Sequence, residues 1–95
     1  MKTLYGPRFI ADLETIVDHA KLDAPDRARA FVEEVQTLCR ETIAAHPRIG
    51  RRRPELGAHR RSFATHGRTI FYSFDPDADE LRFDRLLGKQ EAALW

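Results

Sequence analysis

The hydrophobic pattern changes its period midway through this chain of 95 residues, and that change limits the possible folds more than any other feature. In the first half, apolar residues recur at steps of three and four, as on one face of an α-helix. From residue 61 onward they alternate with polar residues, as in β-strands with one buried face. A chain that forms helices first and strands afterwards is expected to be an α+β domain.

Two helices are predicted in the first half. The first begins at Pro7, where proline is favoured, and carries an apolar stripe from Phe9 to Ala20. The second begins near Pro25 and ends before Pro47, because the residue preceding a proline avoids the helical conformation. Its apolar face has the strongest periodic signal in the chain: Ala28, Phe31, Val32, Val35, Leu38, Cys39, Thr42 and Ile43. The short break at residues 22–26 implies an antiparallel helical hairpin.

Strands are predicted at residues 2–5, 61–65, 68–74 and 80–87. His66-Gly67 is a two-residue hairpin signal, and "DPDAD" at 75–79 forms the next turn. Within 68–74, Ile70, Tyr72 and Phe74 share one face. The expected order is β-α-α-β-β-β: an N-terminal strand and an antiparallel helical hairpin packed on one face of a mainly antiparallel sheet, in a single domain over 1–95.

Composition excludes several classes of protein. The chain is 42% hydrophobic and 33% charged, which argues against disorder, and no apolar run approaches the ~20 residues of a membrane span. Its one cysteine, Cys39, excludes an internal disulfide and fits a reducing cytosol, so a cytoplasmic protein without membrane association is expected. The four histidines lack metal-ligand spacing and no glycine motif fits a nucleotide, so neither a metal nor a cofactor is predicted.

Positive charge is concentrated in the middle of the sequence, although the net charge is only +1. Residues 46–72 hold seven arginines and one acidic residue, whereas residues 73–95 hold three basic and six acidic residues. Such a segment is either a solvated loop, a surface for phosphate or acidic groups, or part of an active site. The basic residues expected to bind a partner are Arg51, Arg52, Arg53, Arg60, Arg61, Arg68, Arg85 and Lys89.

A catalytic alternative is metal-free RNA cleavage, which needs a base, an acid and cations beside the phosphorane. The candidate acids and bases are Glu55, His59 and His66. The candidate stabilisers are Arg61, Arg68 and Arg85, and Tyr72 is a candidate stacking partner. These groups are scattered over loops and strands, and their convergence does not follow from the sequence.

The motifs also suggest a family. "GPRFIADLETIVDH", "HPRIGRRRPELG", "RRSF", "RTIFYSFDP" and "LRFDRLLGKQE" together resemble a ParE-type toxin of the RelE/ParE superfamily, over nearly the whole chain. The resemblance implies a helical hairpin against a curved antiparallel sheet. It also implies a toxin of a type II toxin–antitoxin system.

Two activities are known on this scaffold. ParE-like members trap DNA gyrase with cleaved DNA and are not nucleases, whereas RelE-like members cut mRNA on the ribosome. Many relatives end the last strand with leucine-histidine-glycine, but here Leu87 occupies the position of the histidine. That departure removes a late acid or base, so the resemblance favours a gyrase poison with no catalytic residues, and the ribosome-dependent endonuclease is the alternative.

The resemblance further implies a ParD-like antitoxin in a hetero-oligomeric complex. The C-terminal segment of such an antitoxin folds onto the toxin, and its N-terminal region binds operator DNA, which the toxin contacts only indirectly. We expect the arginine-rich segment to supply part of the charge that attracts the antitoxin's acidic side chains.

Overall fold

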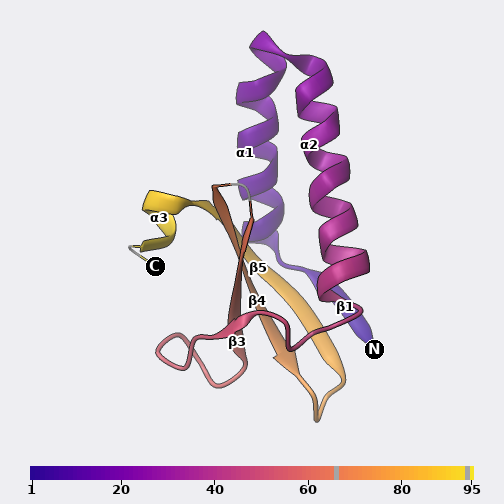
Figure 1. Cartoon of the computed structure of the whole chain (residues 1–95), viewed down its shortest axis with the longest axis vertical. Coiled ribbons are helices and arrows are strands. Elements are labelled where there is room, and N and C mark those ends of the chain that lie inside the picture. Colours follow the sequence, from indigo (N-terminus) through magenta and orange to yellow (C-terminus); the bar gives the residue numbers. More distant parts are fainter. Residues whose placement is uncertain (66, 94) are drawn as a thin grey trace.

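The computed structural model describes residues 1–65, 67–93 and 95, and shows a helical hairpin packed on a sheet (Figure 1). Helix α1 (Pro7–Asp23) and helix α2 (Pro25–Thr37) lie side by side, and their connecting tip points away from the sheet. Each begins with proline in its first turn, as the sequence predicts. Among the described residues, no helix is both long and apolar enough to cross a membrane.

The second predicted helix changes its geometry before it ends. Leu38–Ile43 forms a π-helical segment (η1), in which the Ala44 N–H donates to the Cys39 carbonyl five residues earlier, at 2.9 Å. The wider turn buries Cys39 and Ile43 completely. The helical region therefore ends at Ile43, three residues before His46, and its last part is π-helical where an α-helix was predicted.

The strands are β1 (Lys2–Tyr5), β2 (Arg51–Arg52), β3 (Arg60–Thr65), β4 (Arg68–Asp75) and β5 (Glu80–Gly88), and a short helix α3 (Lys89–Ala93) follows. They form one sheet in the order β1-β5-β4-β3-β2, with β1 parallel to β5 and all other pairs antiparallel. This confirms the predicted α+β class and the four longer strands. Strand β2 was not predicted, because two residues are too few to show a period. The turn predicted at His66-Gly67 includes His66, which lies outside the described residues.

The core lies between the sheet and the hairpin. Ile70, Tyr72 and Phe74 of β4 all point toward the helices, as their alternation predicts. The ring of Phe83 packs against Phe9 of α1, with 5.7 Å between ring centroids. The remaining buried members of this core are Val35, Cys39, Ile43, Leu81 and Leu86.

A carboxylate closes the exposed edge of β5 where β1 no longer covers it. Asp12 of α1 accepts the backbone N–H of Leu86 at 3.0 Å. It also accepts two hydrogen bonds from the Arg85 guanidinium, at 2.8 and 3.0 Å. Those hydrogen bonds raise the pKa of Arg85 above its ordinary value. Asp12 thus links the helical hairpin to the last strand.

Candidate functional site

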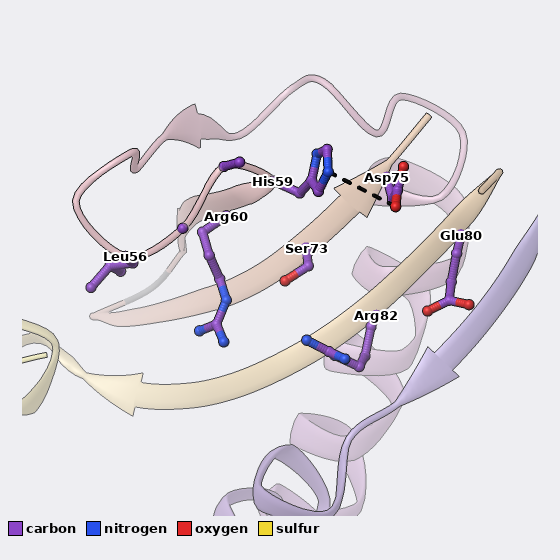
Figure 2. A pocket seen from close by; sticks show the side chains of 9 residues that line it. Leu56, His59, Arg60, Ser73, Asp75, Glu80 and Arg82 are labelled. Atoms are coloured by element: carbon purple, nitrogen blue, oxygen red, sulfur yellow. Dashed lines mark ion pairs between the residues drawn. The ribbon is translucent and has the colours of Figure 1, made fainter. Parts of the chain in front are cut away.

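The face of the sheet opposite the hairpin carries a polar cleft of about 370 Å³ (Figure 2). Arg60 of β3 and Arg82 of β5 extend into it from opposite sides of Ser73. At its other end His59 points toward Asp75, with 3.9 Å between Nε2 and the carboxylate. The cleft is lined by Leu56, Gly57, Ala58, His59, Arg60, Ser73, Asp75, Glu80 and Arg82.

Asp84 pairs with both arginines of this cleft, and Asp75 and Glu80 also line it. The Arg82 Nε donates to the Asp84 carboxylate at 2.7 Å, and the Ser73 hydroxyl donates at 2.6 Å. The Arg60 Nε lies 3.5 Å from the same group. Asp84 has no cross-strand partner in β4, because the pairing register shifts between Phe71 and Tyr72. The positive charge of this cleft is therefore largely balanced within the protein.

Two aromatic rings, Phe71 and Trp95, also lie on this face. Phe71 is completely buried because Trp95 packs edge-on against it, with 4.4 Å between centroids. The guanidinium groups of Arg60 and Arg85 lie 5.2 and 5.9 Å from the Trp95 ring. Arg53 lies 5.5 Å from the Phe71 ring. These arginines are held over aromatic faces, which fixes their positions.

Two side chains of the sheet, Tyr72 and Arg61, hold the loop between η1 and β2 by hydrogen bonds. The Tyr72 hydroxyl donates to the Pro47 carbonyl and accepts the Gly50 N–H, both at 2.8 Å. Burial raises the pKa of Tyr72. The Arg61 Nη1 donates to the carbonyls of Arg48 and Gly50, at 3.2 and 2.9 Å. The arginine-rich segment is therefore a fixed part of the fold and not a free loop.

This arrangement corrects the expectation that Tyr72 could stack on a nucleobase. The ring is completely buried in the core, and its hydroxyl is occupied by the loop. It also explains Gly50, since a Cβ at that position would lie 2.5 Å from the Tyr72 hydroxyl.

The two candidate acids and bases that the structure describes have different partners, although His59 shares a cleft with the candidate stabiliser Arg61. Glu55 is exposed and paired with Arg53 at 3.2 Å, whereas His59 is paired with Asp75. Arg68 lies at the opposite end of β4 from Asp75, about 24 Å away for seven residues of antiparallel strand. His66 lies outside the described residues.

The candidate binding residues differ in the contacts that they make within the protein. Arg53, Arg60, Arg61 and Arg85 make polar contacts within the protein. Arg68 lies 5.6 Å from the Phe31 ring. Arg51, Arg52 and Lys89 are exposed and make no hydrogen bond or ion pair through their side chains with the described residues.

An apolar groove of about 440 Å³ runs between α1 and α2. It is lined by Tyr5, Phe9, Ile10, Leu13, Val35, Gln36 and Arg40. Ile10 and Tyr5 are 44% and 43% exposed, which is unusual for large apolar side chains beside a core. The sequence did not indicate this groove, because an amphipathic stripe does not show which of its apolar residues the core leaves exposed.

The described residues thus define a small α+β domain with charged clefts on its sheet and an apolar groove on its helices. Over residues 4–92 the sequence matches the family described as ParE toxin of type II toxin-antitoxin system, parDE, and the chain belongs to that family. Among solved structures, it resembles a chain of the chromosomal ParDE TA system from P. aeruginosa, with a TM-score of 0.65 and 20% sequence identity. That match covers 93% of this chain and 95% of the other, and shows the same fold. No curated protein matches the sequence significantly.

Proposed function

We propose that this toxin acts in the cytoplasm by binding and poisoning DNA gyrase, without catalysing a reaction itself, and that a cognate antitoxin neutralises it. Membership of the ParE family supports a type II toxin. The resemblance to ParE-like members that trap gyrase supports gyrase as the target. We favour binding over catalysis on one structural observation: Glu55 and His59 each pair with another residue of the protein.

General acid–base cleavage requires a base and an acid within hydrogen-bond reach of the same substrate. Glu55 pairs with Arg53, and His59 lies 3.9 Å from the Asp75 carboxylate, at the opposite end of β4 from Arg68. Leu87, at the position where many relatives carry histidine, is a buried leucine. A surface that binds a protein target needs no such convergence.

The direct test incubates the purified chain with gyrase and supercoiled plasmid. Cleaved or unsupercoiled DNA is expected, whereas primer extension on translating ribosomes should show no codon-positioned cuts. Combined Glu55→Gln, His59→Gln and His66→Gln substitutions should leave gyrase poisoning intact. Codon-positioned cuts that vanish in this triple variant would instead establish the RelE-type endonuclease.

The apolar groove between α1 and α2 is the site that we assign to the antitoxin. Its exposed Ile10 and Tyr5 offer contact area for apolar anchors, and Arg40 at its rim offers a charge for an acidic side chain. An antitoxin segment that orders on binding would bury these groups.

Substitution of Ile10 tests this assignment. Ile10→Asp places a charge in the groove and should weaken antitoxin binding at least about tenfold in calorimetry. Leu22→Asp is the matched control, because Leu22 lies at the hairpin tip and is 85% exposed. Equal affinity of the two variants would move the antitoxin away from this groove.

A further inference from the structure

A second cleft, of about 230 Å³, lies at the arginine-rich end of the sheet. It is lined by Arg48, Arg52, Ala58, His59, Arg60, Arg61, Phe74 and Pro76. Four of these eight residues are arginines and none is acidic. The arginines come from three segments: the loop after η1, strand β2 and strand β3.

The fold holds these cations in place before any ligand arrives. The Arg48 guanidinium lies 5.1 Å from the centroid of the Phe74 ring. Arg61 is fixed through its Nη1, which donates to the carbonyls of Arg48 and Gly50. Arg52 is the cross-strand partner of Arg61, so the two side chains leave the sheet on the same face.

Three of the charges have no counter-charge. Arg60 is paired with Asp84 and His59 with Asp75, but Arg48, Arg52 and Arg61 form no ion pair within the part of the chain that the structure describes. Like charges directly opposite on neighbouring strands are destabilising. The Nε and Nη2 of Arg61 also find no acceptor among the described residues. An anion in the cleft would remove the repulsion and supply that acceptor.

We propose that this cleft binds a phosphate group of a DNA backbone. This inference rests on the proposed function: the toxin would bind both gyrase and the DNA that gyrase holds. A phosphate presents oxygens in several directions and suits guanidinium groups that approach from three segments, whereas a carboxylate presents two oxygens in one plane. The small volume fits one phosphate with its hydration and leaves no room for a folded peptide.

The test measures binding of the toxin alone to a fluorescent 12-base-pair duplex by anisotropy, over a series of salt concentrations. The combined Arg48→Gln and Arg52→Gln variant should bind about tenfold more weakly, and its logarithmic salt slope should be smaller by about 0.9, the value for one phosphate. Arg27→Gln with Arg29→Gln is the matched control: it removes the same charge from exposed positions on α2. Thermal unfolding of both variants verifies that they fold, and Arg52→Gln alone serves if the first double variant does not.

Equal loss in the cleft variant and the control would overturn the inference, since net charge alone would then explain binding. A polyglutamate peptide of similar charge is the second probe. If its binding falls as much as that of the duplex, the cleft is an acidic-peptide site and the assignment to phosphate is wrong. The gyrase assay is separate: failure to poison gyrase with cleft-dependent DNA binding intact rejects only the proposed function. If the Arg48→Gln and Arg52→Gln variant binds DNA as the unaltered toxin does, and the toxin poisons gyrase, only the assignment of the cleft is rejected.

Discussion

Replacing Tyr72 by phenylalanine should destabilise the protein by detaching the arginine-rich loop from the sheet. The substitution keeps the ring in the core but removes an oxygen that donates to Pro47 and accepts the N–H of Gly50. Gly50 is buried, so water does not readily replace the lost acceptor. A buried donor left unsatisfied costs about 1–3 kcal/mol. A loss near the middle of that range lowers the unfolding temperature of a domain this size by about 10 °C.

Thermal unfolding measures the magnitude, and hydrogen exchange at the Gly50 amide locates it. The free energy of exchange at the Gly50 amide should fall by more than the free energy of global unfolding. Tyr5→Phe is the control: it makes the same chemical change at a ring that is 43% exposed and whose hydroxyl has no hydrogen bond among the described residues. Equal loss of stability in the two variants, or unchanged protection at Gly50, would refute the anchoring role.

Three further results are expected. Asp12→Ala should lower the free energy of unfolding in urea by about 2–4 kcal/mol, because it leaves Arg85 and the Leu86 N–H without their partner. Asp18→Ala removes an exposed ion pair with Lys21 and should change that free energy by less than about 0.5 kcal/mol. Burial raises the pKa of Cys39 to about 12, so the contribution of the protonated thiol to stability is complete below about pH 9 and is lost as the pH rises toward 12. Cys39→Ala should therefore flatten the alkaline decline in unfolding temperature. A thiol reagent should label Cys39 only after unfolding. Arg51→Glu should slow antitoxin association at low ionic strength and lose this effect at high salt; association rates that do not change in stopped-flow measurements would contradict the steering role.

The period of the hydrophobic pattern was enough to predict the two long helices, the longer strands and the core between them. Ile70, Tyr72 and Phe74 alternate strictly, and each faces the core as expected. Periodicity could not predict η1, because whether a helix widens depends on the sheet against which Cys39 and Ile43 pack.

The contacts of the charged residues were beyond the sequence for a different reason. Asp12 and Arg85 are 73 positions apart, and no local pattern indicates that they meet. The arginine cluster was visible as charge, but composition does not distinguish Arg61, fixed by backbone carbonyls, from Arg52, which has no ion pair among the described residues. Arg48 was not selected at all, since only the fold brings it beside β2 and β3.

The parallel pairing of β1 with β5 sets the order in which this protein is completed during synthesis. Strands β3, β4 and β5 follow one another closely in the sequence and can pair as soon as they emerge, but Lys2 pairs with Glu80. At translation rates of roughly 5–20 residues per second, the first strand waits about 4–16 s for its partner. During that interval Tyr5 and Phe9 lack the Phe83 ring on which they pack. The groove that we assign to the antitoxin contains both of these residues, so a nascent toxin acquires its complete antitoxin site only when translation is nearly finished.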